Sequence, residues 1–233
     1  MRIVDCEQSS DRWHLCRKGR PTASRYGAII TSTGKPCTGQ TRETYMLELL
    51  AERLTGRVTD HYVSSAMDRG TILEPRARDW YTMQTGQAVN QIGFAYTDDG
   101  RAGASPDGLC GDVGAIEIKC PGDKAQIVTL MRGKVPVVYV PQVHGVMWVC
   151  ERQWCDFISW TDSGLPSVVI RVARCNDYIA AMREAVVAFC DELDEREADL
   201  RKRYGIEPRE SADIEQASGD KYPFPNEPLP EEA

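Results

Sequence analysis

Two carboxylates and one amine lie close together in the sequence between Gly103 and Pro121. Asp107 is part of a Ser-Pro-Asp-Gly stretch that is typical of a turn, and Glu117 and Lys119 follow in an apolar segment that favours a strand. Because side chains alternate faces along a strand, Glu117 and Lys119 point the same way. A turn folded back against this strand would bring the three groups together. Such a group could hold Mg²⁺ and activate water against a phosphodiester.

Each residue type suits that chemistry. Mg²⁺ prefers oxygen ligands and keeps several waters, so Asp107, Glu117 and the backbone carbonyl of Ile118 would suffice. A second ion could share Asp107, and Lys119 could orient or deprotonate the attacking water or offset charge in the transition state. The alternative is an amphipathic edge strand with solvated charges, because such spacings often arise by chance. The apolar context of Glu117 and the preceding turn favour the nuclease interpretation.

Five sequence blocks, in order and at similar spacings, resemble the phage-lambda-type exonuclease family, also called YqaJ-like viral recombinases, within the restriction-endonuclease-like nucleases. They are the residues 13–24, 69–78, 105–108, 117–121 and 139–149. An isolated Asp…Glu-x-Lys pattern is unspecific, whereas five ordered blocks are specific. The resemblance spans most of the chain, but the residues beyond about 206 have no counterpart in it.

The resemblance implies further residues of the catalytic centre. Glu74 would be an active-site acid close to the metal-bound water. Gln142 would lie on a helix that lines the same cleft and would contact the scissile phosphate or a water. On the residues alone, Glu74 would be a surface acid and Gln142 a hydrogen-bonding partner of nearby backbone.

The resemblance also implies a pocket for the terminal 5′-phosphate of the strand being cut, formed by Arg17, Ser24 and Ser105. Arginine grips a phosphate with two parallel donors, and serine hydroxyls add further donors. On the residues alone, Arg17 would be an exposed arginine and Ser24 a helix cap. Lys18 and Arg20 stand beside Arg17 as alternatives for the phosphate grip.

The function implied by the resemblance is a Mg²⁺-dependent, ATP-independent 5′→3′ exonuclease that acts on duplex DNA ends, with two ions per site and Mn²⁺ as a substitute. It would leave 3′ single-stranded overhangs for phage-type recombination, as a ring-shaped homotrimer with a single-strand annealing protein as partner. The alternatives are a related endonuclease of restriction or junction-resolving type and a DNA-binding scaffold with an inactive centre. The intact Asp107, Glu117 and Lys119 argue against the scaffold, and the terminal-phosphate clamp favours the exonuclease.

The composition narrows the class of protein further. With 233 residues, 42% of them hydrophobic and 27% charged, the chain suits one globular domain with an ample core. Neither a membrane-spanning run nor a signal peptide is visible, so we expect a cytoplasmic protein of a bacterial host cell with no membrane partner. The nine cysteines predict reduced, mostly buried thiols; they include no Cys-x-x-Cys pair, which argues against an iron–sulfur cluster. Three histidines argue against a zinc site.

The net charge of −7 is unusual for a DNA-binding protein. The residues 207–233 contain eight acidic and two basic residues, which leaves a net charge of −1 for the first 206 residues. We therefore predict a nuclease domain at 1–206 and an acidic, Pro-rich tail at 207–233 that is disordered or loosely docked. The basic residues of the N-terminal part cluster as a candidate DNA-binding set: Arg12, Arg17, Lys18, Arg20, Arg25, Arg42, Arg53 and Arg57.

The patterns of apolar residues and of helix-capping and turn signals predict an α/β or α+β fold in which helices flank a central mixed β-sheet. The five tryptophans are expected to be core or interface anchors. Helices are expected around Trp13, from Thr22 or Ser24, at 41–54, from Ser64 or Ser65 to Thr85 with a kink at Pro75, and at 124–131, 139–151 and 177–203. Strands are expected at 89–97, 101–105, 115–119, 154–160 and 168–172.

Overall fold

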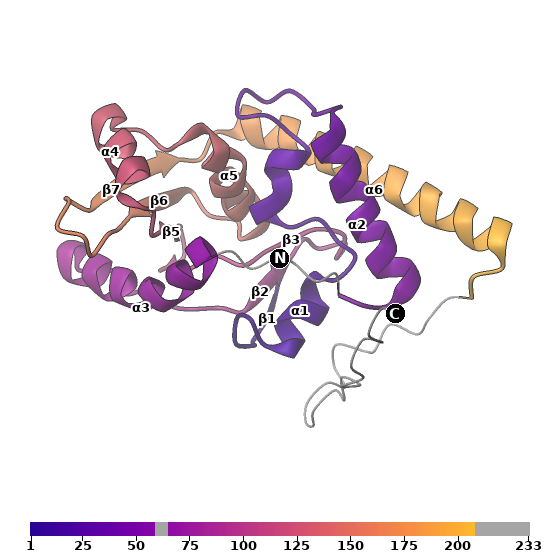
Figure 1. Ribbon diagram of the computed structural model, residues 1–233, viewed down its shortest axis with the longest axis horizontal. Helices are drawn as coiled ribbons and strands as arrows, with labels where there is room; N and C mark the ends of the chain where they lie inside the picture. The colour runs from indigo at the N-terminus through magenta and orange to yellow at the C-terminus, as the bar shows by residue number, and fades with distance from the viewer. Residues whose placement is uncertain (59–64, 208–233) are drawn as a thin grey trace, which may run out of the picture.

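A four-stranded mixed sheet lies toward one end of the molecule, on the left in Figure 1. The computed structural model describes residues 1–58 and 65–207, without the side chains of residues 65–68. The strand order is β4 (Gly108–Cys110), β5 (Gly114–Lys119), β6 (Trp154–Ser159) and β7 (Val168–Ala173). The β5–β6 pair is parallel and the other two pairs are antiparallel. The predicted α/β class with a mixed sheet is confirmed.

Helices cover both faces of this sheet. On one face, α3 (Ser65–Thr85) packs Leu73 and Tyr81 against Ile116 and Ile118 of β5. On the other face, α5 (Val140–Val149) shares a core with Ala115 and Phe157 of the sheet. The odd and even positions of β5 therefore face different helices, as the strand period requires. Glu117 and Lys119 belong to the α5 side.

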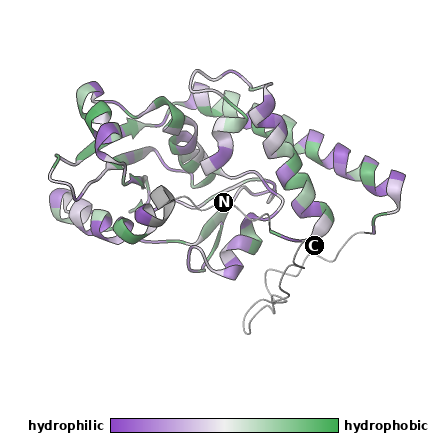
Figure 2. Ribbon diagram, in the orientation of Figure 1, coloured by the Kyte–Doolittle hydropathy of each residue, from purple (hydrophilic) through white to green (hydrophobic). Residues whose placement is uncertain are grey.

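The larger core extends from α5 into a helical layer. It contains η1 (Ala23–Ala28), α2 (Gln40–Thr55) and α6 (Asn176–Tyr204). Figure 2 shows hydrophobic residues concentrated on α5 and the sheet, whereas α6 carries both hydrophobic and hydrophilic residues along its length. Gly56, with φ +70°, ends α2 in the left-handed conformation that glycine adopts readily.

A second sheet, which the sequence did not predict as separate, holds the N-terminus. It has the order β1 (Arg2–Val4), β2 (Phe94–Tyr96) and β3 (Gly103–Ala104), all antiparallel. The helix α1 (Asp11–Arg17) packs on it through Trp13 and Cys16. The sequence analysis did not anticipate this second sheet, because β1 has only three residues and is too short for a visible alternation.

The predicted strand at 89–97 is also corrected. Asn90 exchanges both backbone hydrogen bonds with Leu109 of β4, at 2.8 Å each, while β2 begins only at Phe94 and pairs with β1 and β3. One apolar stretch thus serves two sheets. The segment from Thr22 or Ser24 is the 3₁₀ helix η1, and not an α-helix.

The remaining predicted helices are confirmed within a few residues. These are α2, α3, α5, α6 and α4 (Asp123–Arg132), and a short 3₁₀ helix, η2 (Val137–Tyr139), leads into α5. All nine cysteines are free and five are buried, as expected of structural thiols. None of the helices in the described ranges combines the length and apolar character that a bilayer-spanning helix needs. The predicted tail lies outside the described residues apart from Glu207, so the domain boundary stays a prediction.

Candidate active site

The β4–β5 hairpin brings Asp107 to the side of β5. Asp107 directly precedes β4, and its Oδ2 accepts a hydrogen bond of 2.5 Å from the backbone N–H of Ile118. The last paired residues of the hairpin at this end are Gly108 and Ile116, so Ile118 lies beyond the ladder. Since the N–H and C=O of one strand residue point to the same edge, the Ile118 carbonyl also faces the Asp107 side.

Glu117 is the most buried of the candidate residues, with 1% of its surface exposed. Its Oε1 accepts a hydrogen bond of 2.6 Å from Lys119 Nζ. Its Oε2 is buried and has no hydrogen-bond partner among the described residues. A buried carboxylate oxygen without a donor is costly, so this atom is a natural position for a cation.

The helix α3 adds a third carboxylate through Arg78. The guanidinium of Arg78 forms an ion pair with Glu74, one turn away on the same helix. Its Nε also donates to the backbone carbonyl of Asp107, at 3.1 Å. Arg78 therefore brings Glu74 next to the turn that carries Asp107.

The nearby cations do not fully compensate the negative charges of Glu74, Asp107 and Glu117. Burial raises the pKa of Glu117 to about 8; the ammonium of Lys119 opposes this shift, and the charges of Asp107 and Glu74 add to it. Burial and the charge of Asp107 raise the pKa of Glu74 to about 7, against the opposing effect of Arg78. Burial also raises the pKa of Asp107. Burial tends to lower the pKa of Lys119, but Glu117 and Asp107 outweigh it and raise that pKa.

The residues present fit Mg²⁺. In the described part of the chain, no three side chains of the His, Cys, Asp and Glu types are grouped so as to hold a metal ion by themselves. Mg²⁺ does not require such a cage, because it commonly binds one or two carboxylates and keeps several waters. Asp107, Glu117 and the Ile118 carbonyl are hard oxygen donors, and the unpartnered Oε2 of Glu117 is available.

Gln142 lies on α5, half-buried, on the same side of the sheet as Glu117. Tyr139 precedes α5 by one residue, and Lys119 Nζ lies 5.2 Å from the centre of its ring. Gln142 follows Tyr139 by three residues, and residues three apart share a helix face. This places Gln142 on the face of α5 that starts beside Lys119.

A second polar site forms around Arg17, at the end of α1. One terminal nitrogen of Arg17 lies 3.1 Å from Ser24 Oγ and 3.3 Å from Thr22 Oγ1, and the other lies 3.4 Å from Ser105 Oγ. The guanidinium stacks on the ring of Trp13, 4.2 Å from its centre, and the indole N–H of Trp13 donates to Ser105 Oγ at 2.7 Å. We call these five residues the phosphate pocket, after the ligand that the family resemblance implies for Arg17, Ser24 and Ser105.

Arg17 forms no ion pair with a carboxylate among the described residues. Burial lowers its pKa, yet an arginine keeps its charge at neutral pH. A desolvated guanidinium ringed by hydroxyls is suited to an anion such as a phosphate. Lys18 and Arg20 are directed elsewhere, because Lys18 Nζ donates to Gly56 O and Arg20 donates to Cys16 O. Arg17 is therefore the best placed of the three for an anion.

The sequence analysis did not identify several functional candidates. Trp13 is more than a packing residue, because it holds both Arg17 and Ser105. Its position four residues before Arg17, on the same face of a helix, was an available signal. The same spacing links Arg78 to Glu74. Thr22 carries no comparable signal, because its role depends on the course of the chain after α1.

Much of the predicted DNA-binding set is engaged within the protein. Arg25 pairs with Glu48, Arg42 with Glu192, and Arg53 with Asp194 and Glu197. These arginines connect helices to one another, so their clustering in the sequence does not form a free basic surface.

Comparisons with known proteins show the family and the fold of the chain. The YqaJ-like viral recombinase domain matches residues 12–153, which include all candidate site residues. An alkaline exonuclease from Laribacter hongkongensis superposes with a TM-score of 0.77 at 37% identity, covering 84% of this chain and 98% of that one. Its complex with dAMP matches with the same TM-score and coverage at 38% identity. A phage-related exonuclease from Haemophilus somnus shares the fold, with a TM-score of 0.60 at 17% identity, over 78% of this chain and 96% of that one. No curated protein sequence matches.

The fold and the site thus define a nuclease that acts on DNA. The chain belongs to the YqaJ-like viral recombinase family.

Proposed function

We propose that this nuclease is a Mg²⁺-dependent, ATP-independent 5′→3′ exonuclease that digests one strand of duplex DNA from its end. The observation that carries the proposal is the adjacency of two sites of opposite charge. Ser105 belongs to the phosphate pocket, and Asp107 belongs to the carboxylate centre that it forms with Glu74 and Glu117. Two residues of chain span at most about 7 Å. An anion in the pocket would therefore lie beside the hydrolytic centre, as a strand end bound by its terminal phosphate requires.

The residues of the centre have separable roles in this proposal. Asp107, Glu117 and the Ile118 carbonyl would hold Mg²⁺, and the metal would lower the pKa of a bound water and offset transition-state charge. Lys119, fixed by Glu117 at 2.6 Å, orients the attacking water and faces the developing negative charge. Glu74, whose pKa is raised to about 7, is suited to exchange a proton with that water near neutral pH. Gln142 would position the phosphate from α5.

The phosphate pocket would give the enzyme its direction. A terminal 5′-phosphate bound by Arg17 places the first phosphodiester at the centre, so each cut releases a 5′-mononucleotide and exposes a new 5′-phosphate. The relative from Laribacter hongkongensis has been described in complex with dAMP, a mononucleotide of this kind. Repetition of the cycle leaves a 3′ single-stranded overhang.

The family resemblance extends the proposal to assembly and partner. We expect a homotrimeric ring around duplex DNA and a single-strand annealing protein that takes up the overhang for recombination. A mass from light scattering tests the trimer: three chains of 26.0 kDa would support it, and a monomer at all concentrations would contradict it.

The activity is tested with three forms of one plasmid: linear, nicked and closed circular. With Mg²⁺, an exonuclease of this type degrades the linear form, and end labels show loss from the 5′ ends. Cleavage of the closed circle would instead support the endonuclease alternative. No cleavage of any form, with DNA binding retained, would support the inactive scaffold. Reactions with EDTA test the metal requirement.

A further inference from the structure

Within the phosphate pocket, the turn that connects Arg17 to Thr22 and Ser24 is centred on Gly19. Arg17 precedes Gly19 by two residues, and Thr22 and Ser24 follow it by three and five. The distance from Arg17 to the two hydroxyls therefore depends on the path of the chain at Gly19. This residue has φ +68°, a conformation that favours glycine, and an added Cβ would lie 2.6 Å from Arg53 Cγ.

Two consecutive residues at the end of α2 hold both polar groups of Gly19. Its N–H donates to Oε2 of the buried Glu52 at 2.7 Å, and its carbonyl accepts from Arg53 Nε at 2.6 Å. Further along the turn, the N–H of Thr22 donates to the hydroxyl of Tyr45 at 3.0 Å. The turn is closed by its own hydrogen bond from the Arg20 N–H to Arg17 O, at 3.3 Å. Its contacts with Glu52, Arg53 and Tyr45 fix its position against α2.

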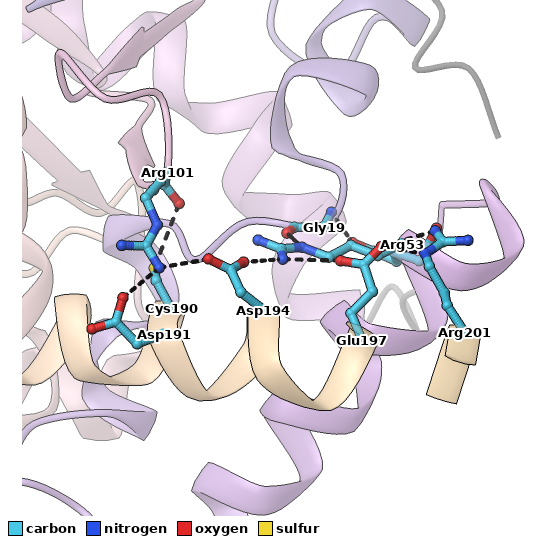
Figure 3. A network of polar contacts seen from close by, with 9 residues as sticks. Gly19, Arg53, Arg101, Cys190, Asp191, Asp194, Glu197 and Arg201 are labelled. Atoms are coloured by element: carbon cyan, nitrogen blue, oxygen red, sulfur yellow. Dashed lines mark hydrogen bonds and ion pairs between the residues drawn. The ribbon is translucent and has the colours of Figure 1, made fainter. Parts of the chain in front are cut away.

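Arg53 is itself fixed from the opposite side by α6. Its Nη1 lies 2.6 Å from Asp194 Oδ1 and 3.2 Å from Glu197 Oε2, and Figure 3 shows the side chain extended between Gly19 and these two carboxylates. Arg201 also donates to Glu197 and to the backbone carbonyl of Arg53. The guanidinium of Arg53 therefore links the Gly19 turn to α6.

Asp194 extends this support to the Ser105 side of the pocket. It also accepts from Arg101, at 2.7 Å, which lies between β2 and β3. Gly103 of β3 donates to Pro21 O, and Ser105 follows two residues later. One network of α6 carboxylates (Figure 3) thus contacts both Arg53, which holds the Gly19 turn, and Arg101, which precedes β3.

We propose that Arg53 is a positioning residue of the phosphate pocket, which holds the Gly19 turn so that the guanidinium of Arg17 meets Ser24 and Ser105. The inference rests on the proposed function, since it assumes that the pocket binds a terminal 5′-phosphate. Arg53 does not touch the phosphate. It acts on the recognition of the strand end and not on hydrolysis.

The test compares Arg53→Gln with Arg42→Gln. The two arginines are a matched pair, since both lie on α2, both have side chains 19% exposed and both bridge to α6, but Arg42 contacts Glu192 and not the Gly19 turn. The measured quantity is the ratio of kcat/KM on duplexes with 5′-phosphate to that on 5′-hydroxyl duplexes. Arg53→Gln should lower this ratio about three- to tenfold, mainly by raising KM for the phosphorylated end. Arg42→Gln should leave the ratio unchanged.

A double-mutant cycle separates positioning from general damage. In an Arg17→Ala background the pocket has lost its cation, so adding Arg53→Gln should not lower the ratio further. If Arg53→Gln does not fold, Gly19→Ala perturbs the same turn from the other side and should also lower the ratio. A wild-type ratio in the folded variant, or equal loss on both substrates, would overturn the inference alone. Equal wild-type rates on both ends would overturn the phosphate pocket of the proposed function, and this inference with it.

Discussion

The carboxylate centre has more negative than positive groups, whereas the phosphate pocket has a positive group without a paired carboxylate among the described residues. In the centre, Glu74, Asp107 and Glu117 outnumber their cations, and the pKa of each carboxylate is raised. In the pocket, Arg17 is desolvated and has hydroxyl partners but no carboxylate in an ion pair among the described residues. The difference indicates what each site lacks, which is cations in the first and an anion in the second. In the proposed function, DNA and Mg²⁺ would supply both.

The first prediction removes the negative charge from the centre and has the largest expected effect. Glu117→Gln and Asp107→Ala should each lower hydrolysis by about 10³-fold or more, because metal binding and transition-state stabilisation are lost together. DNA binding and folding should persist. Glu117→Gln should also raise the melting temperature in EDTA, since the buried carboxylate lacks sufficient positive charge without a metal.

These effects are measured by single-turnover cleavage and by thermal denaturation. Glu184→Gln, an exposed substitution on α6, is the control and should change neither. Near-normal hydrolysis by either centre variant at ordinary Mg²⁺ concentrations would contradict the assignment of these carboxylates.

The second prediction removes the positive charge from the same centre. Lys119→Ala should lower the single-turnover rate by roughly 10²- to 10³-fold, because the ammonium faces the charge that develops in the transition state. It also fixes Glu117 Oε1 at 2.6 Å. Lys124→Ala on α4, an exposed lysine, is the control. A loss below threefold in Lys119→Ala would show that the ammonium is a structural counter-ion only.

The centre could be predicted from sequence because it is local. Asp107, Glu117 and Lys119 lie within 13 consecutive residues, and turn and strand rules alone bring them together. The mixed sheet and the long helices were predictable for the same reason, since each has its own periodicity. The short strands β1 and β4 have too few residues for a period, and Asn90 joins a sheet that its own segment does not reveal.

The phosphate pocket was accessible only through family resemblance. Its residues come from α1, the Gly19 turn, η1 and the loop before β4, and no local rule connects these segments. The roles of Arg42 and Arg53 were misjudged for the same reason. Their carboxylate partners on α6 lie about 140 to 150 residues away in the chain, so the sequence shows the arginines but not the ion pairs.

The third prediction concerns the pocket and is smaller, because recognition is lost but chemistry is not. Wild-type enzyme should degrade 5′-phosphorylated duplexes on the order of tenfold faster than 5′-hydroxyl duplexes, since a charged hydrogen bond contributes about 1.5–3 kcal/mol. Arg17→Ala should remove most of this preference by slowing only the phosphorylated substrate. Initial rates on paired substrates measure it. An Arg17→Ala enzyme that retains the preference would show that the 5′-phosphate binds elsewhere.

The fourth prediction uses the raised pKa of Glu117 in the metal-free protein. Its pKa is about 8 in the folded state and near 4.5 when unfolded, so between these values the folded state holds a proton that the unfolded state lacks. The stabilisation from that proton is present below pH 4.5 and is lost as pH rises through 8. The melting temperature in EDTA should therefore fall from pH 6 to pH 8.5, and less so in Glu117→Gln. Parallel pH profiles for the two proteins would contradict this pKa assignment.

The fifth prediction has the smallest expected effect and tests whether either site depends on the acidic tail. Truncation after Ile206 removes 27 residues with a net charge of −6 and none of the candidate site residues. The cut also deletes Glu207, whose carbonyl accepts a hydrogen bond of 2.8 Å from Arg201. Arg201 keeps its contacts with Glu197 and Arg53, so the network behind the phosphate pocket should persist. Hydrolysis and the 5′-phosphate preference should both stay within about twofold of the full chain, whose acidic residues would if anything repel DNA. A truncated protein that folds but has lost the preference, and not hydrolysis, would show that the tail supports the pocket through α6. Loss of both activities would place the tail within the enzyme proper.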